Sequence, residues 1–404
     1  MQYRTDLKSG NKLSIIGFGC MRFPRNITQI DVNKTEQLIV KAVEEGINYF
    51  DTAYAYGGSE EALGAVLLKN NLRDRIFLAT KLPFGKCKAY NDFDSLFQTQ
   101  LERLHTDYID YYLIHNIGDV QEWKRLCVLG IEKWILEKKT SGQIKNIGFS
   151  FHGIHDEFLK LLDIYDWDFC QIQYNYINTN FQAGTAGLKM ASEKGIPVII
   201  MEPLLGGKLA DGLPRKANNV FKAANSTLTP AAWGLRWLWN QKEVTVVISG
   251  MNEMSQLEDN IRTAQNAVPD LLTDAENKTF ESVIKIIETS YKIPCTGCNY
   301  CMPCPHQVNI PACFSAYNVS FVAGRFSGFH LYVTSTALLN PLKNYAASNC
   351  KACGACEKKC PQHIPIITSL KKVTKRMQPF WIKTGLKIFM KFSSSAKVSK
   401  FKDS

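Results

Sequence analysis

The sequence predicts an α/β protein in which a closed (β/α)8 barrel is followed by a small, mainly α-helical domain. Two observations support this prediction. Eight short apolar runs alternate with eight amphipathic helical patterns between residues 16 and 266. Nine of the 13 cysteines then fall between residues 295 and 360, beyond the last of these repeats. The repeats account for a large domain, and the cysteines indicate a second one.

The barrel prediction depends on the order of its elements. A hairpin over 3–16, with its turn at 8–11, comes first. The expected strands are 16–20, 47–50, 76–80, 109–114, 144–149, 169–172, 198–201 and 244–248. The expected helices are 31–46, 59–70, 92–104, 120–141, 154–164, 183–195, 229–240 and 253–266. Eight such units suit a closed barrel of buried parallel strands. An open doubly wound sheet is the alternative, and the lack of a Gly-x-Gly-x-x-Gly turn after the first strand weighs against it.

The domain boundaries follow from changes in this pattern. One more helix is expected over 273–290, and the periodicity breaks at 293–295. We therefore assign 1–290 to the barrel, 291–371 to the cysteine-rich domain and 372–404 to a basic tail. Within the second domain, the segment 305–349 is interpreted as two helices that separate near 324–328.

Composition and charge narrow the class of protein. Hydrophobic residues make up 45% and charged residues 21% of 404 residues, as in ordinary globular proteins. There is neither a signal-like start nor an apolar run long enough to span a membrane, so we expect a cytoplasmic protein. The net charge is +11, and residues 371–404, with ten Lys or Arg and one Asp, supply +9 of it. We therefore expect no nucleic-acid-binding face on the main domain.

The tail itself has a basic amphipathic pattern, in which Lys383, Lys387 and Lys391 fall four residues apart. Such a pattern suits a membrane surface or an acidic partner. A solvated terminal helix that packs on its own domain is the interpretation we favour.

Four reactive side chains follow three successive predicted strands. Asp51 ends the second strand with Tyr56 in the loop after it, Lys81 follows the third strand, and His115 follows the fourth. Each of them alone would be an ordinary polar residue. The carboxyl ends of barrel strands meet at one rim, however, so together they indicate a site. A phenol beside an ammonium suits reduction of a carbonyl by hydride, because the phenol can deliver the proton that the oxygen needs. Asp51 would hold Lys81, and His115 would orient the substrate oxygen.

The same residues resemble the motifs of the aldo/keto reductase family. The similarity is carried by 48–64 (NYFDTAYAYGGSEEALG), the Lys81 segment, 107–116 (DYIDYYLIHN), 148–150 and 171–175, and it extends over residues 1 to 290. It implies a nicotinamide cofactor bound without a glycine-rich turn. It also implies that the catalytic tetrad is Asp51, Tyr56, Lys81 and His115. Ser150 and Gln171 would hold the nicotinamide carboxamide.

The chain also departs from the family pattern. Met201 stands where members often carry an aromatic residue that stacks on the nicotinamide. Ser249, Gly250, Met251 and Gln256 occupy the region where NADP-preferring members place cations. Asp259 and Asn260 still match the adenine end of the cofactor site. The choice between NAD and NADP therefore stays open.

The clustered cysteines have the spacing of iron–sulfur ligands. The first group is Cys295, Cys298, Cys301 and Cys304, and the second is Cys350, Cys353, Cys356 and Cys360. The second group, followed by Pro361, is the C-x2-C-x2-C-x3-C-P run of ferredoxins that carry four-iron clusters, and the first shortens the last gap by one residue. In that motif the fourth cysteine ligates the other cluster. We therefore predict two [4Fe–4S] clusters in a ferredoxin-like domain, one held by the first three cysteines with Cys360 and one by Cys350, Cys353 and Cys356 with Cys304. Zinc is the alternative, but its sites lack the trailing Cys-Pro. Cys313 is left over.

The sequence thus predicts an NAD(P)(H)-dependent oxidoreductase that interconverts a small carbonyl compound and an alcohol. Its clusters would relay electrons, sense redox state or brace the domain, and an electron-transfer protein is a further candidate partner. A direct path from nicotinamide to cluster is doubtful without a flavin, because a hydride carries two electrons and a cluster accepts one. The alternative function is an electron-transfer or redox-sensing protein whose barrel is a docking or cofactor-sensing module. The sequence reveals neither the substrate nor the oligomeric state.

Overall fold

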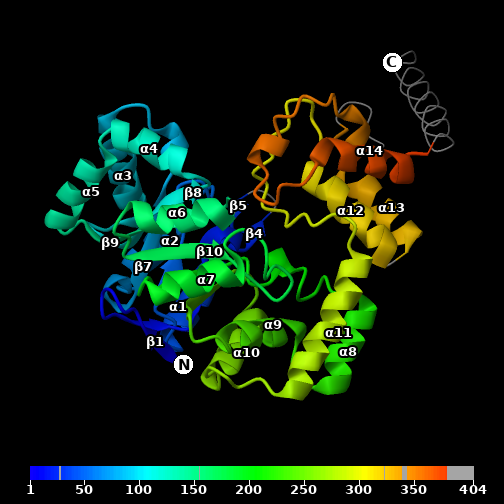
Figure 1. Ribbon diagram of the computed structural model, residues 1–404, viewed down its shortest axis with the longest axis horizontal. Coiled ribbons are helices and arrows are strands. Elements are labelled where there is room, and N and C mark those ends of the chain that lie inside the picture. The colour runs from blue at the N-terminus through cyan, green and yellow to red at the C-terminus, as the bar shows by residue number, and fades with distance from the viewer. Residues whose placement is uncertain (27–28, 154, 323, 339–343, 380–404) are drawn as a thin grey trace, which may run out of the picture. The chain divides into compact units, whose positions relative to one another are not determined.

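The computed structural model describes residues 1–379 apart from 27–28, 154, 323 and 339–343 (Figure 1). The described chain forms two compact units. The first comprises Met1–Asp211 and Phe221–Phe280, and the second comprises Gly212–Val220 together with the described residues from Glu281 onward. The basic pattern predicted after residue 380 lies outside the described residues.

The first unit is a closed barrel of eight parallel strands. They are β3 (Ile16–Gly19), β6 (Tyr49–Asp51), β7 (Phe77–Leu82), β8 (Ile109–Ile117), β9 (Ile144–Phe151), β10 (Phe169–Gln173), β11 (Val198–Met201) and β12 (Val244–Ser249). Each strand pairs with the next in the chain, and β12 pairs with β3 to close the ring. The predicted (β/α)8 barrel is therefore confirmed. The predicted hairpin is also present, as β1 (Tyr3–Thr5) and β2 (Lys12–Ser14).

The strands are apolar on both faces because both are buried. Side chains that point inward, such as Tyr49, Tyr111, Phe169 and Val246, fill the lower barrel. Their neighbours on the same strands pack outward against the helices. Toward the carboxyl end of the strands the inward positions become polar, with Lys81 on β7 and Gln171 on β10. That change from apolar to polar filling marks where a site can form.

The helices of the first unit lie largely where the sequence predicts them. They are α1 (Val32–Glu44), α2 (Ser59–Lys69), α3 (Tyr90–Leu104), α4 (Val120–Val128), α5 (Ile131–Thr140), α6 (His155–Ile164), α7 (Gly184–Glu193), α9 (Pro230–Trp239) and α10 (Met254–Gln265). Two more, α8 (Arg215–Ala224) and α11 (Asp274–Ser290), each have residues in both units. The prediction of one helix over 120–141 is wrong. The chain breaks at Gly130, whose φ of 90° is incompatible with a continuous helix, and α4 and α5 lie on either side.

The second unit is small and helical, as predicted. Besides its parts of α8 and α11, it contains α12 (Ile310–Val322), α13 (Arg325–Ser335) and α14 (Ile366–Met377), with short turns η5 (Ala347–Asn349) and η6 (Glu357–Lys359) beside the second cysteine group. It has its own apolar core, to which Phe314, Tyr332, Leu370 and Val373 contribute. Of the helices that the structure describes, none is long and apolar enough to cross a membrane.

Candidate active site and cysteine centre

The four predicted catalytic side chains meet at the carboxyl rim of the barrel. Lys81 Nζ lies 2.6 Å from Asp51 Oδ1 and donates a second hydrogen bond, of 2.8 Å, to the carbonyl of Thr52. The same nitrogen lies 5.3 Å from the centre of the Tyr56 ring. The Tyr56 and His115 rings stand perpendicular, with centroids 5.9 Å apart. The structure therefore brings an acid, an amine, a phenol and an imidazole together.

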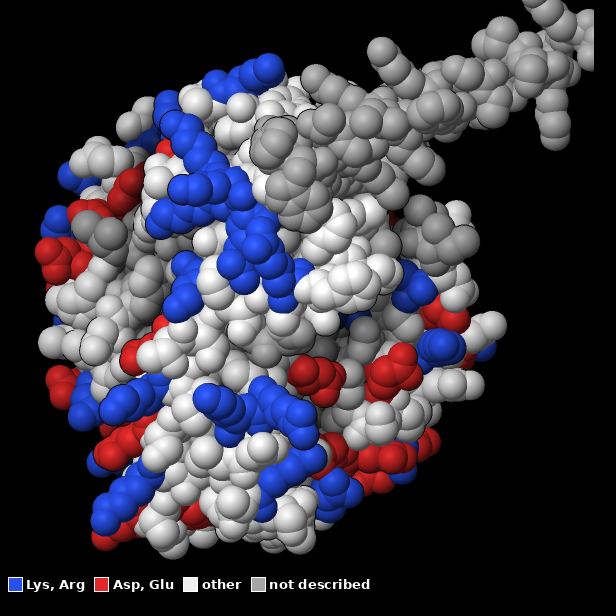
Figure 2. Space-filling model, turned by 90° about the vertical axis from the view of Figure 1, so that its right-hand side faces the viewer, with Lys and Arg blue, Asp and Glu red and all other residues white. Residues whose placement is uncertain are grey.

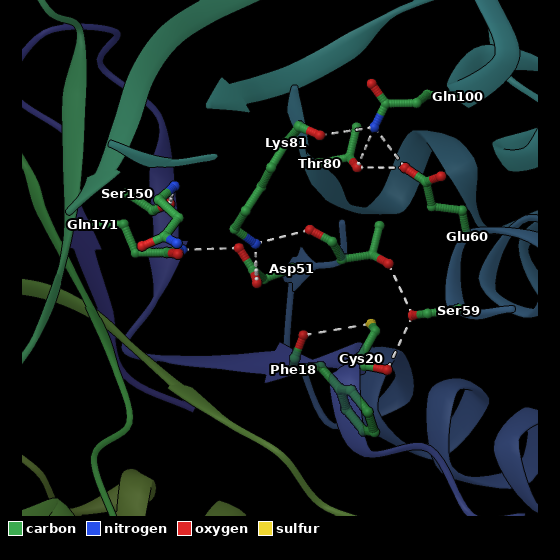
Figure 3. Close-up of polar contacts among 12 residues, drawn as sticks. Phe18, Cys20, Asp51, Ser59, Glu60, Thr80, Lys81, Gln100, Ser150 and Gln171 are labelled. Atoms are coloured by element: carbon green, nitrogen blue, oxygen red, sulfur yellow. Dashed lines mark hydrogen bonds and ion pairs between the residues drawn. The ribbon is translucent and has the colours of Figure 1, made fainter. Parts of the chain in front are cut away.

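Asp51 and Lys81 form a buried ion pair in which each side chain makes a further hydrogen bond. The side chains are only 6% and 1% exposed, so neither charge is stabilised by bulk water. One carboxylate oxygen of Asp51 accepts the hydrogen bond from Lys81, and the other accepts a 2.9 Å hydrogen bond from the Gln171 amide (Figure 3). Asp51 therefore fixes Lys81 beneath the Tyr56 ring and ties β6 to β10 across the barrel.

His115 is held in its neutral form. Burial lowers its pKa well below the ordinary 6.5, and the nearby positive charge of Lys81 lowers it further. A neutral imidazole can donate one hydrogen bond to a substrate oxygen without adding a competing acid.

A second hydrogen-bond network lies behind the tetrad and was not predicted. The carboxylate of Glu60, which is 1% exposed, accepts from Thr80 Oγ1 at 2.6 Å and from Gln100 Nε2 at 2.7 Å (Figure 3). Gln100 also donates to the carbonyl of Lys81 at 3.1 Å. This network fixes the backbone from which Lys81 extends, and it joins α2 and α3 to β7.

A hydrogen bond between two hydroxyl groups joins the ends of the loop that carries Tyr56. Thr52 Oγ1 and Ser59 Oγ lie 2.8 Å apart, and Ser59 also donates to the carbonyl of Cys20 at 3.0 Å. These bonds anchor the loop on either side of Tyr56.

The residues expected to bind the nicotinamide end also lie at this rim. Ser150 stands opposite Gln171 in the register of β9 and β10, and its Oγ accepts a 2.7 Å hydrogen bond from the backbone of Asn116. Met201 ends β11 and stands opposite Gln173. The residues expected at the adenine end lie on α10 instead. Asp259 accepts from Thr229 at 2.6 Å and pairs with Arg262, and Asn260 donates to Ser249 at 3.1 Å.

Two buried polar groups beside Met201 suit a polar ligand. Within the described structure, both amide atoms of Gln173 and one carboxylate oxygen of Glu202 are buried without a hydrogen-bond partner. Burial raises the pKa of Glu202 to about 7. Buried polar groups are almost always satisfied. Orphaned atoms at this rim therefore fit a site whose ligand completes their hydrogen bonds. Neither residue was predicted, because their burial cannot be read from the sequence.

Cysteines of the two sequence groups lie near one another in the second unit. Burial raises the pKa of Cys301 to about 12, with further contributions from its neighbours Cys295, Cys298 and Cys360. These four cysteines line one cavity with apolar walls that include Phe314.

Three members of the other predicted set, Cys304, Cys350 and Cys356, also lie near one another. The pKa of Cys356 is raised by burial first, and by nearby Cys350 and Cys304 in addition. Among the described residues, no three His, Cys, Asp or Glu side chains are arranged to hold a single metal ion. The fit to iron–sulfur clusters therefore rests on this grouping. It crosses between the two sequence motifs, as the motif rule requires. Cys313 is buried in the helical core instead.

Residues 15–285 match the family model described as "Aldo/keto reductase family". The chain belongs to the aldo/keto reductase family. Residues 294–364 match a second model, described as "4Fe-4S dicluster domain". The predicted combination of an aldo/keto reductase barrel and a carboxyl-terminal ferredoxin-like domain is therefore confirmed.

Individual aldo-keto reductases match between 63% and 70% of this chain. An aldo-keto reductase of Mycolicibacterium vanbaalenii is 29% identical over 63% of this chain and 84% of its own length. One from Schizosaccharomyces pombe, whose name specifies NADP(+), is 25% identical over the same shares. A solved aldo-keto reductase of Klebsiella pneumoniae in complex with NADPH has a TM-score of 0.58 at 22% identity, covering 70% of this chain and 95% of that one. That likeness shows the fold.

Proposed function

We propose that this aldo/keto reductase interconverts a small aldehyde or ketone and the corresponding alcohol, using NADP(H) or NAD(H). The observation that supports it best is the buried Asp51–Lys81 pair beneath the Tyr56 ring, with the ring of His115 perpendicular to that of Tyr56. Family membership supports the reaction class, and the relative named for NADP(+) supports a nicotinamide cofactor.

The tetrad would handle the proton while a bound nicotinamide supplies or accepts the hydride. The phenol of Tyr56 donates a proton to the carbonyl oxygen as negative charge grows there. The ammonium of Lys81 stabilises the phenolate that remains, and the carboxylate of Asp51 holds that ammonium in place. His115 directs the substrate oxygen toward Tyr56 by a hydrogen bond. In alcohol oxidation the same groups act in reverse.

The cofactor would lie along the rim from β9 to α10. Ser150, Gln171 and Met201 would hold the nicotinamide end, and Asp259 and Asn260 the adenine end. Gln173 and Glu202, whose buried atoms lack partners in the described structure, are additional candidates for polar contacts with it.

The second domain would hold two [4Fe–4S] clusters. Cys295, Cys298, Cys301 and Cys360 would hold one, and Cys304, Cys350, Cys353 and Cys356 the other. The match to a dicluster domain and the grouping of the cysteines support this assignment. Because hydride transfer moves two electrons, the clusters would not take part in the carbonyl step itself. We keep 1–290, 291–371 and 372–404 as the proposed barrel, dicluster domain and tail, although α14 continues to Met377.

Replacement of one phenol tests this function. We expect anaerobically purified protein to reduce members of a panel of model aldehydes and ketones with at least one of the two nicotinamides. Tyr56→Phe should lower kcat on the order of 10²-fold or more, because it removes the proton donor. Cofactor affinity, measured by fluorescence titration, should change little.

Tyr54→Phe is the matched control. Tyr54 lies two residues away, where its ring contacts Lys86 and Arg103 rather than the tetrad. Full turnover by Tyr56→Phe would refute the assignment. Reducible clusters without any turnover of the panel by the wild-type protein would favour the electron-transfer function instead.

A further inference from the structure

We propose that the lysine-rich surface of the dicluster domain docks an acidic protein that carries one electron. This inference rests on the cluster assignment in the proposed function. The surface, here called the basic face, consists of six exposed side chains in the described part of the domain: Lys351, Lys358, Lys359, Lys371, Lys372 and Lys375.

The net charge differs in sign between residues 1–290 and residues 291–379. Residues 1–290 contain 32 Lys or Arg and 35 Asp or Glu, a net of −3. Residues 291–379 contain ten Lys or Arg and one acid, Glu357, a net of +9. A four-iron cluster in its 2+ state with four thiolates carries about −2, so two clusters would offset about four of these charges. A surplus of positive charge therefore remains after the clusters are counted.

The basic face is built from two adjacent elements. Lys351, Lys358 and Lys359 lie within the second cysteine group, whose Cys353 is exposed. The helix α14 carries the other three lysines on the side opposite its buried residues, which include Leu370 and Val373.

The single acid in this part of the chain joins those two elements. The Glu357 carboxylate accepts a 2.8 Å hydrogen bond from the backbone of Ile367, in the first turn of α14. It therefore connects η6 to the helix. Figure 2 shows Lys and Arg side chains gathered in a band on one face of the molecule.

This arrangement favours a redox protein over other polyanions. Three of the lysines are set between or next to cluster ligands, so an anionic partner held by them would sit beside the cluster with the exposed Cys353. Electron transfer needs that proximity, whereas binding to nucleic acid or to a membrane gains nothing from it. Complementary charge chiefly accelerates encounter, which suits a partner that binds briefly. In the step itself one electron would pass from the reduced carrier to the cluster that Cys350, Cys353, Cys356 and Cys304 would hold, and no bond or proton would move.

Salt-dependent reduction kinetics test the proposal on the intact protein. The probe is a reduced plant-type [2Fe–2S] ferredoxin, an acidic carrier, mixed anaerobically with the cluster-loaded full chain in a stopped-flow instrument. The second-order rate of cluster reduction should fall about tenfold or more between low and high salt. The triple variant Lys351→Glu, Lys358→Glu, Lys359→Glu should lose about tenfold at low salt, and Lys371→Glu, Lys372→Glu, Lys375→Glu should lose several-fold.

The matched control reverses three exposed lysines of the barrel, Lys12→Glu, Lys124→Glu and Lys189→Glu, and should keep the wild-type rate. Iron content and reduction by dithionite are measured for every variant, since neither needs a docked protein. Protein that dithionite reduces but ferredoxin reduces slowly and without salt dependence would overturn the docking proposal alone. Protein without iron would overturn the cluster assignment and the docking with it.

Binding to duplex DNA or to phosphatidylserine vesicles is measured with the same variants. Binding that the basic-face variants lose while their ferredoxin rates stay normal would also overturn the proposal.

Discussion

The side chains of Asp51 and Lys81 form an ion pair that is buried inside the barrel. A buried ion pair contributes little net stability, because desolvation cancels most of the attraction. Removing one partner, however, leaves a buried charge with no counterion. The pair is therefore better explained by its position beneath Tyr56 than by any contribution to folding.

Lys81→Met should consequently cost stability as well as activity. We expect a loss of about 3–5 kcal/mol in the free energy of unfolding, because Asp51 would keep only Gln171 and water-poor surroundings. The double variant Asp51→Asn, Lys81→Met should recover much of that stability while staying inactive. Urea denaturation and turnover assays measure the two effects separately. A double variant as unstable as the single one would show that the loss arises from packing, not from charge.

The lowered pKa of His115 predicts loss of stability in mild acid. Its pKa in the folded state lies well below that of the unfolded chain, so between these two values the unfolded chain binds more protons. Stability should therefore fall as the pH decreases below about 6.5, by up to about 1.4 kcal/mol per pH unit from this group. His115→Gln should flatten that slope in urea denaturation curves, and His105→Asn, at the exposed end of α3, should not. Equal slopes in wild type and His115→Gln would contradict the assignment.

For individual residues, the sequence was sufficient to predict the tetrad but not the side chains that hold the tetrad in place. Asp51, Lys81 and His115 end consecutive strands, so the barrel rule alone places them together. Glu60 and Gln100 lie on helices, where an acid or an amide usually faces water. Only the packing of α2 and α3 against β7 shows that these two residues are buried and hydrogen-bonded to each other.

Among the elements, α2 and α3 pack closely enough to exclude a methyl group. A Cβ atom added to Gly64 would lie 2.2 Å from the carbonyl oxygen of Arg103 and 2.7 Å from Leu104 Cα. These are backbone atoms at the end of α3, so they cannot rotate away. The glycine sets the distance between the two helices that carry Glu60 and Gln100.

Gly64→Ala should therefore destabilise the barrel by about 1–3 kcal/mol or more. It should also lower kcat, because separation of the helices strains the network behind Lys81. Gly85→Ala is the control, since nothing lies within 4 Å of a Cβ atom there and its φ is not positive. Thermal unfolding and kcat are the measurements. Wild-type behaviour of Gly64→Ala would mean that the helices can move apart freely.

Most element boundaries were predictable because burial and periodicity coincide in this fold. Each strand is a short apolar run, and most helices have one apolar face. The failures have physical causes. The break between α4 and α5 depends on the positive φ of Gly130, and glycine inside a helical pattern does not by itself show such a turn. The helix α8, over Arg215–Ala224, was missed because it lies in the connection between the seventh predicted strand and the seventh predicted helix, where the barrel repeat calls for no further helix. The helix α14 was obscured because its charge pattern resembled the start of the tail.

For the whole molecule, the iron content of cysteine variants should show which cysteines hold each cluster. Cys298→Ser should reduce iron to about half, near four atoms per chain instead of eight, because one four-iron cluster loses a ligand. Cys313→Ala removes a buried cysteine outside both sets and should leave the iron unchanged. Iron and sulfide analysis after anaerobic purification decides the point. Loss of iron in Cys313→Ala alone would require a different ligand assignment.

The division of the chain into units also affects how the domains can be separated. Gly212–Val220, which includes the buried Leu213 and Ala217, belongs to the second unit although β12 follows it in the chain. The hydroxyl of Tyr291 donates to the carbonyl of Gly212. A chain that ends at residue 290 would expose this segment, so cysteine variants are a cleaner way to ask whether the barrel works without clusters.

The pairing of β3 with β12 has a consequence for synthesis of the protein. The first of these strands leaves the ribosome early, and the other only after more than half of the chain has been translated. Until β12 is made, the sheet is open, with one unpaired edge at β3 and another at the last strand already formed. A transcript with a stop codon upstream of Val244 would therefore yield an open, aggregation-prone ribbon rather than a weaker enzyme.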